Sequence, residues 1–247
     1  MRILFTNDDG YDSIGLHAVA DLFKNEHDIA VVAPDMQKSA ASHSITLRPG
    51  VLTCREVTGY DYKVFAVGGS PVDCVKTAAS LVFPKPDLVI SGINNGENLG
   101  SDIWYSGTVS AASDAAHLGF RAIALSLDNK HAAEDDYKAC AKFVKSNISL
   151  LASIQLPPKS LLNINFPNSK PIGVKITKMN TQITFVDEYV FLENNVVSPE
   201  GRRDYSALNE DNDEYWCKRG YITITPLLMD RTDYSVLKAM SEDGFLL

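Results

Sequence analysis

Residues 2–10 read RILFTNDDG, a short apolar run that ends in two adjacent aspartates and a glycine. The run has the composition of a buried β-strand, and the apolar residues from Leu16 to Phe23 then recur at helical spacing. Asp8 and Asp9 therefore lie in the first strand-to-helix turn. In an open α/β sheet this turn lies at the carboxyl ends of the strands, where ligands bind. The stretch predicts a ligand site in the first turn of such a sheet.

The two aspartates carry like charges that need compensation. Two carboxylates about 4 Å apart repel each other by roughly 4 kcal/mol at an effective dielectric constant near 20. A divalent cation offsets this repulsion directly, because hard cations take oxygen ligands. The simpler alternative is that Asp8 and Asp9 cap the first helix and point apart into water.

The alternation of strand and helix patterns continues along the chain. Strands are predicted at residues 2–6, 28–34, 87–91, 121–127 and 161–166, and helices at about 15–26, 71–83, 105–118 and 133–152. This alternation is typical of an α/β fold with a Rossmann-like, doubly wound and mostly parallel sheet. Residues 45–58 and 62–67 predict a hairpin of less buried strands beside the main sheet.

The pattern changes after Pro167. Residues 172–225 are β-rich, and a last helix is predicted at about 233–242. We therefore expect a catalytic core at 1–167 and a β-rich extension at 168–247, whose final strand and helix pack back on a core. Within the extension, 193–219 is polar and poor in core residues, so we interpret 181–219 as an oligomerisation arm or a long hairpin.

Composition restricts the partners of the 247-residue chain. The formal net charge is −8, which argues against a nucleic-acid polymer because phosphate tracking needs a basic surface. The four cysteines are scattered without metal-type spacing, as expected for reduced thiols in a cytoplasmic protein. The longest apolar runs are too short to span a membrane. We expect a cytoplasmic protein that binds neither nucleic-acid polymers nor membranes.

Oxygen-bearing side chains follow three predicted strands. Besides the paired aspartates, Ser39 follows strand 28–34, and Asn94 follows strand 87–91 with Asn95 and Asn98 close behind. Two carboxylates with neutral hydroxyl and amide oxygens suit Mg²⁺ or Mn²⁺, with water completing the octahedron. Taken singly, Ser39 also fits an exposed turn, and the asparagines also fit turn positions.

A helix start adds a second element to this edge. Ser106, Gly107 and Thr108 combine two hydroxyls, a flexible glycine and the free amides of a helix N-terminus, which binds phosphate. A metal beside such a helix start is the minimal apparatus for hydrolysing a phosphomonoester. The alternative is an ordinary helix cap.

Seven motifs together resemble the SurE family and appear in that family's order over nearly the whole chain. They lie at residues 1–10, 32–39, 69–75, 91–100, 105–109, 162–167 and 220–227. The resemblance implies a metal-dependent nucleotidase that removes phosphate from nucleoside 5′- and 3′-monophosphates, and in some members from short polyphosphate. It also implies a Rossmann-like N-terminal part and C-terminal segments that exchange between subunits, giving a homodimer or a homotetramer.

The resemblance also assigns roles to residues. One divalent metal ion per subunit, Mg²⁺ or Mn²⁺, is expected on the positions that match the family's ligands, which are Asp8, Asp9, Ser39 and Asn94. The positions that match the phosphate pocket are Asn98, Ser106, Gly107 and Thr108. Among these two sets, the expected catalytic residues are Asp8, Asp9, Asn98 and Ser106.

Two positions depart from the family pattern. Glu97 stands where many members have proline and places a third acidic group near the loop, and residues 181–219 match weakly. Neither departure assigns a role to Glu97 or to that segment.

Other classes fit the sequence less well. A receiver module needs a phospho-accepting aspartate after strand 87–91, where Ser91-Gly92-Ile93-Asn94 stands instead. The first turn lacks the G-x-G-x-x-G of dinucleotide binding. The acidic pair is adjacent, whereas aspartyl-phosphate phosphatases space theirs by two. A non-enzymatic Mg²⁺-binding signalling or stress module of Rossmann-like fold is the remaining alternative.

Overall fold

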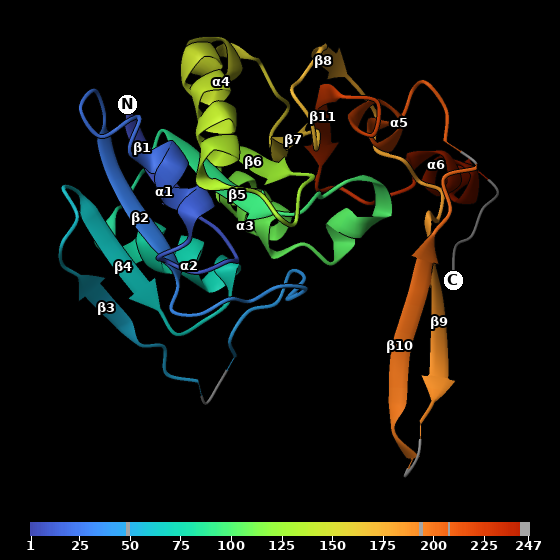
Figure 1. Ribbon diagram of the computed structural model, residues 1–247, viewed down its shortest axis with the longest axis horizontal. Coiled ribbons are helices and arrows are strands. Elements are labelled where there is room, and N and C mark those ends of the chain that lie inside the picture. Colours follow the sequence, from blue (N-terminus) through green and yellow to red (C-terminus); the bar gives the residue numbers. More distant parts are fainter. Residues whose placement is uncertain (48–49, 193–194, 207, 243–247) are drawn as a thin grey trace.

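The computed structural model describes residues 1–247 except 48–49, 193–194, 207 and 243–247, so parts of the predicted segments 45–58 and 193–219 lie outside the described residues (Figure 1). In the described part, the central sheet has the strand order β3-β4-β2-β1-β5-β6-β7-β11-β8. These strands are β1 (Arg2–Thr6), β2 (Asp28–Pro34), β3 (Cys54–Val57), β4 (Lys63–Val67), β5 (Leu88–Asn95), β6 (Arg121–Leu127), β7 (Ser160–Phe166), β8 (Gly173–Ile176) and β11 (Tyr221–Leu228).

The middle of the sheet is parallel, as predicted. Strands β4, β2, β1, β5, β6 and β7 run in one direction, while β3 pairs antiparallel with β4 and β11 pairs antiparallel with β7. The chain leaves β1 toward β2 on one side and returns to β5 on the other. This reversal of strand order creates a crevice at the carboxyl ends of β1 and β5.

Helices cover both faces of the sheet (Figure 1). Helices α1 (Ile14–Ala20) and α4 (Glu134–Ser153) share one apolar cluster with Ile3 and Phe5 of β1. The other face carries α2 (Pro71–Thr77) with the adjoining turn η1 (Ala78–Val82), and α3 (Gly107–His117), preceded by the short helix η2 (Gly100–Trp104). Because both faces are buried, the central strands are nearly continuous apolar runs.

The predicted hairpin belongs to the main sheet, and its placement beside the sheet was wrong. Strand β4 pairs in parallel with β2 from Lys63 opposite Ala30 to Val67 opposite Pro34, and β3 begins only at Cys54. Val64 and Val67 are fully buried, so β4 supplies core side chains while β3 forms the exposed edge.

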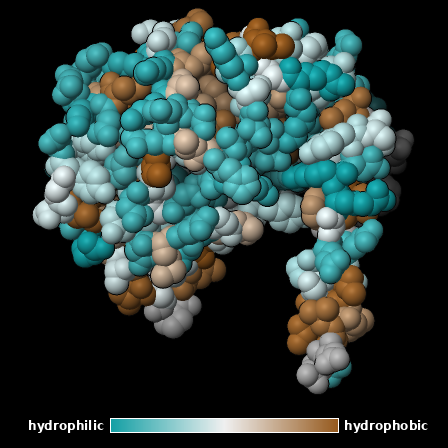
Figure 2. Space-filling view, in the orientation of Figure 1, coloured by the Kyte–Doolittle hydropathy of each residue, from teal (hydrophilic) through white to brown (hydrophobic). Residues whose placement is uncertain are grey.

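The C-terminal part continues the sheet and adds a projecting hairpin. Strands β9 (Phe185–Phe191) and β10 (Val197–Arg203) form a separate antiparallel pair that extends away from the body (Figure 1). Apolar side chains gather on this hairpin (Figure 2). Beyond it, α5 (Asp213–Cys217) returns to the body, and the exposed helix α6 (Tyr234–Glu242) follows β11.

Residues 193–219, predicted to be poor in core residues, include buried side chains near their end. Asp213, Glu214 and Cys217 are buried, and the two carboxylates accept hydrogen bonds from Asn180, so paired polar groups take the place of most apolar ones there. The division of the chain at residue 167 stays a prediction. None of the helices in the described ranges has the length and apolar character needed to cross a membrane.

Candidate active site

A cavity of about 350 Å³ opens at the carboxyl edge of the parallel strands. Five predicted site residues line it, namely Asp8, Ser39, Asn94, Asn98 and Ser106. They come from the segments that follow β1 and β2, from the end of β5 and the segment after it, and from the residue before α3, so the structure brings together parts of the chain spread over about 100 positions. The other three predicted site residues lie behind this lining. Gly107 and Thr108 contact Asp8, and Asp9 accepts a hydrogen bond from Gln37.

Asp8 is a buried carboxylate held by the start of α3. Its residue is 4% exposed, and the hydroxyl of Thr108 donates a hydrogen bond to its Oδ1 atom. Burial raises the pKa of Asp8 to about 6, the Thr108 hydrogen bonds lower it, and the neighbouring charge of Asp9 raises it again. The Thr108 hydroxyl therefore serves Asp8 in this structure, and its proton does not face the cavity.

The close approach of α3 to Asp8 requires glycine at position 107. A Cβ atom at Gly107 would lie 2.8 Å from both Cβ and Oδ2 of Asp8 and 3.1 Å from Cγ of Pro71. Such short contacts force the backbone apart. Gly107 thus brings the positive end of the helix dipole against the carboxylate.

Asp9 and Ser39 are linked by a residue that the sequence analysis did not single out. The amide nitrogen of Gln37 donates to Oδ1 of Asp9 at 3.3 Å and to Oγ of Ser39 at 2.9 Å. The backbone N–H of Asn95 donates to the other oxygen of Asp9 at 3.1 Å. Burial raises the pKa of Asp9, and these donors lower it. One side-chain amide therefore joins the loops after β1 and β2.

The end of β5 presents Asn94, and the loop after it presents Asn98; the strand predicted at 87–91 therefore continues past Gly92 to Asn95. The side-chain nitrogen of Asn94 donates to the carbonyl of Gly96 at 2.9 Å, which leaves its amide oxygen available to the cavity. Gly92 permits the path of this strand, because it has a φ of +121° and a Cβ atom there would lie 2.2 Å from the carbonyl oxygen of Leu125.

Ser106 is both the N-cap of α3 and a cavity residue. Its hydroxyl oxygen accepts the N–H of Val109 at 3.0 Å, so the simpler reading of the motif as a helix cap is correct. Its hydroxyl proton remains available to donate to an anion. Both roles are compatible in one side chain, because a hydroxyl accepts and donates at the same time.

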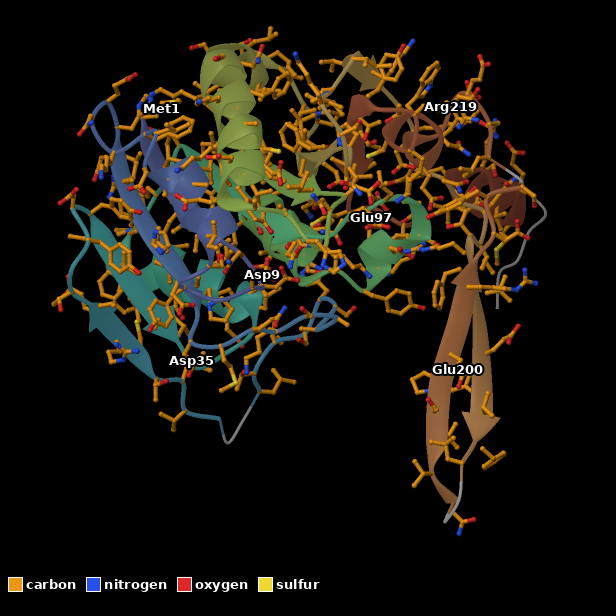
Figure 3. The ribbon with its side chains drawn as sticks, in the orientation of Figure 1. Met1, Asp9, Asp35, Glu97, Glu200 and Arg219 are labelled. Atoms are coloured by element: carbon orange, nitrogen blue, oxygen red, sulfur yellow. The ribbon has the colours of Figure 1, made fainter. Side chains whose placement is uncertain are left out.

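Glu97 faces cations of the C-terminal segment (Figure 3). Its Oε1 lies 3.2 Å from Nζ of Lys218 and 3.8 Å from Nη2 of Arg203, which also pairs with Asp102. Burial raises the pKa of Glu97, but the two cations outweigh burial and hold the pKa below its usual range. The third acidic group near the loop is therefore paired with cations of the chain, which it shares with Asp102 and Asp128.

The donors at the cavity fit a hard divalent cation. In the described chain, neither Asp8 nor Asp9 forms a salt bridge, and no cluster contains three or more His, Cys, Asp or Glu side chains suited to a metal. A cation here would rest on two carboxylates, the hydroxyl of Ser39 and the amide oxygen of Asn94. That all-oxygen set suits Mg²⁺ or Mn²⁺ and lacks the nitrogen and sulfur ligands typical of zinc.

Two further cationic residues line the cavity and were not predicted. Lys130 follows β6, and Arg203 ends β10 at the base of the hairpin. Neither carried a local sequence signal, because their position depends on how distant strands pair.

Behind the cavity, Ser126, Asn163 and Asn165 form hydrogen bonds with Asn98. The two asparagines stand at alternate positions in the mostly apolar strand β7. This pattern is visible in the sequence and could have indicated their role.

The comparisons with known proteins point to one family. A family model described as "Survival protein SurE" matches residues 3–185. The chain is 43% identical over 258 residues to the 5′-nucleotidase SurE of Desulfitobacterium hafniense, covering 98% of this chain and 96% of that protein. It is 38% identical over 251 residues to the 5′-nucleotidase SurE of Clostridium beijerinckii, covering 98% of each.

A solved structure shows the same fold. The SurE protein from Aquifex aeolicus superposes with a TM-score of 0.85 at 31% sequence identity, covering 98% of this chain and 99% of that one. With the family match extending over most of the chain and relatives aligned from end to end, this chain belongs to the SurE family.

Proposed function

We propose that the chain is a metal-dependent phosphomonoesterase that hydrolyses nucleoside 5′- and 3′-monophosphates to nucleoside and phosphate. The observation that carries the proposal is the buried Asp8 carboxylate, which has no cationic side-chain partner in the described chain and lies at the start of α3 beside oxygen donors from two other loops. The relatives named 5′-nucleotidase support the choice of substrate.

The proposed roles divide the cavity into two halves. Asp8, Asp9, Ser39 and Asn94 would hold one divalent cation, Mg²⁺ or Mn²⁺, per subunit. When bound, such a cation would lower the pKa of water and place positive charge beside the phosphoryl oxygens.

On the other half, the Ser106 hydroxyl, the Gly107 backbone amide and the Asn98 side chain would orient the phosphoryl group. Water attacks phosphorus, the bond from phosphorus to the ester oxygen breaks, and the leaving nucleoside takes up a proton. Donors fixed before the reaction stabilise the developing charge without reorganisation.

Phosphate release from AMP and GMP tests the proposal. Purified protein is expected to release phosphate with Mn²⁺ or Mg²⁺ and to lose this activity in EDTA. Asp8→Asn and Asp9→Asn are expected to lower turnover by about 100-fold or more while circular dichroism and the melting temperature report an intact fold. Asp61→Asn, which changes an exposed carboxylate in the β3–β4 turn, is the matched control.

Unchanged turnover in both site variants would refute the assignment. A non-enzymatic Mg²⁺-binding module of Rossmann-like fold would instead bind the cation without releasing phosphate. This alternative is not favoured, because it leaves the relatives' nucleotidase activity and the phosphate-oriented donors without a role. A screen that adds 3′-monophosphates and short polyphosphate would define the substrate range.

We further propose that the β9–β10 hairpin packs on a second copy of the chain, giving a homodimer or a homotetramer in the cytoplasm. The hairpin leaves the body and carries apolar surface (Figure 2). On it, Tyr189 and Phe191 are 69% and 79% accessible. Apolar surface of this kind is stabilised by burial against a partner. A single monomeric species at micromolar concentration in light scattering would contradict this proposal.

A further inference from the structure

The backbone of Asn98 is held by two side chains of β7. Asn165 accepts the N–H of Asn98 at 2.9 Å through Oδ1 and donates to its carbonyl oxygen at 3.0 Å through Nδ2. Asn163 donates to the same carbonyl oxygen at 2.8 Å. The primary amide of Asn165 therefore takes the place of a neighbouring strand at a residue that lies beyond the end of β5.

The side chain of Asn98 is also oriented. Its Nδ2 lies 2.8 Å from the hydroxyl oxygen of Ser126 on β6, and the residue is 6% exposed at the wall of the cavity. Three anchors on two strands thus fix a residue in irregular structure. Asn165 alone is enough to satisfy the backbone N–H and carbonyl groups of Asn98, so the other two hydrogen bonds are not needed for that purpose.

Asn163 is held at a cost to stability. It is fully buried, and its Oδ1 atom has no hydrogen-bond partner among the described residues. An unpartnered buried oxygen destabilises a fold, whereas an apolar side chain at the same point carries no such penalty. Asn165 already supplies the Asn98 carbonyl with a donor, so stability alone does not account for the second amide.

We propose that Asn163 and Asn165 are positioning residues that hold Asn98 in one orientation toward the substrate phosphate. The inference rests on the proposed function of the cavity, in which Asn98 contacts the phosphoryl group. Asn163 and Asn165 are not among the residues that line the cavity. They act through the Asn98 backbone, and Ser126 fixes the remaining rotation of the side chain.

A double-mutant cycle between positions 163 and 98 tests the proposal. Asn163→Val removes the donor and the unpartnered oxygen, and valine suits a buried strand. In an otherwise wild-type enzyme we expect kcat/KM for AMP to fall about fivefold to tenfold, as for the loss of one hydrogen bond. In an Asn98→Ala enzyme the same substitution is expected to change kcat/KM by less than about twofold.

Thr223→Val is the matched control. Thr223 lies opposite Asn165 on β11, is fully buried, and also carries a side-chain oxygen without a partner among the described residues. This substitution likewise removes an unpartnered oxygen, but it leaves the anchors of Asn98 in place. We expect its kcat/KM to equal that of the wild type and the melting temperatures of Thr223→Val and Asn163→Val to be unchanged or raised.

Equal losses of kcat/KM for Asn163→Val in both backgrounds would overturn the proposal, because the residue would then act independently of Asn98. A lower melting temperature with unchanged kcat/KM of the folded enzyme would also overturn it and leave a structural role only. If the valine variant does not fold, Asn163→Ser removes the same donor with less bulk, and the cycle is repeated with it.

Hydrogen exchange separates this inference from the proposed function. Failure of the wild-type enzyme to release phosphate from any nucleotide would refute the function and leave the anchoring open to measurement. Exchange of the Asn98 amide is then expected to be about tenfold faster in Asn163→Val than in wild type and unchanged in Thr223→Val. An unchanged rate in Asn163→Val would show that Asn163 does not hold this loop.

Discussion

The hydroxyl of Thr108 donates a hydrogen bond to a carboxylate oxygen of Asp8, which lies 100 residues earlier in the chain. This contact joins the start of α3 to the turn after β1, across the crevice between the two halves of the sheet. The Asp8 carboxylate therefore already accepts one of the hydrogen-bond donors at the start of α3. Of the residues at this helix start, Ser106 and Gly107 are therefore the ones left for the proposed phosphate contacts, beside Asn98.

Thr108→Val is expected to destabilise the protein, because it leaves the buried Asp8 carboxylate without its hydroxyl donor. A hydrogen bond to a charged group contributes about 1.5–3 kcal/mol, so the free energy of unfolding in urea at pH 7 is expected to fall by about that amount. Phosphate release is expected to fall in the same variant. Thr108→Ser keeps the hydroxyl and is expected to stay close to wild type; equal behaviour of the two variants would show that the contact contributes nothing.

Gly107→Ala is expected to lower turnover about 100-fold, because the new Cβ atom has to displace either Asp8 or the helix start, and a shift of about 1 Å is enough for such a loss. The measurement is phosphate release together with the melting temperature. Gly119→Ala at the other end of α3 is the control, since its Cβ atom meets nothing within 4 Å but its φ of +89° strains alanine. The control is expected to lose stability and keep turnover; loss of turnover in both would contradict the steric argument.

Asp73→Asn is expected to destabilise the protein at neutral pH but not in acid. Burial raises the pKa of Asp73, but hydrogen bonds from Ser70 and Thr46 outweigh it and hold the pKa below its usual range. A carboxyl whose pKa is lower in the folded state stabilises the fold above its unfolded pKa of about 3.9 and loses that effect as pH falls through the folded value.

The expected loss for Asp73→Asn is about 1–2 kcal/mol at pH 7, the size of a helix-cap contribution, and it is expected to shrink as pH falls through the lowered folded pKa of Asp73. Urea unfolding at pH 7 and in acid measures it. Asp61→Asn, at an exposed position, is expected to show no comparable difference. A loss for Asp73→Asn that is the same at both pH values would contradict a role for its charge.

Replacing Tyr189 and Phe191 with serine is expected to shift the protein toward monomer, because it removes apolar area that the proposed subunit contact would bury. Light scattering across a concentration series measures the shift, and circular dichroism is expected to show the wild-type fold. Leu81→Ser, an equally exposed apolar position on the body, is the control and is expected to assemble as wild type. Unchanged assembly in the double variant would exclude these two side chains from the contact.

The elements of the fold followed from periodicity, whereas one strand pairing did not. The apolar run at 28–34 predicts β2 with its observed bounds, because every residue needed for that strand is local. The pairing of β4 with β2 joins residues more than 30 positions apart, and the local pattern at 62–67 fits an edge hairpin equally well. In α5, buried carboxylates replaced the apolar signal on which the prediction of a core segment depends.

The site was predictable where each loop directly follows a strand. Asp8, Ser39 and Asn94 were placed together by the rule that parallel strands end at one edge, and all three line the cavity. Gln37 and Asn165 were missed, because their role lies in contacts to other site residues that only the folded chain brings within hydrogen-bond distance.

The proposed ligands come from three separate strand ends, so no single fragment of the chain contains the whole set. A nascent chain that has not yet added β5 lacks Asn94, and a chain whose strands are out of register presents its aspartates to water. Cation affinity would therefore report on the completeness of the sheet, and the free energy of binding would be added to the stability of the correctly assembled protein alone.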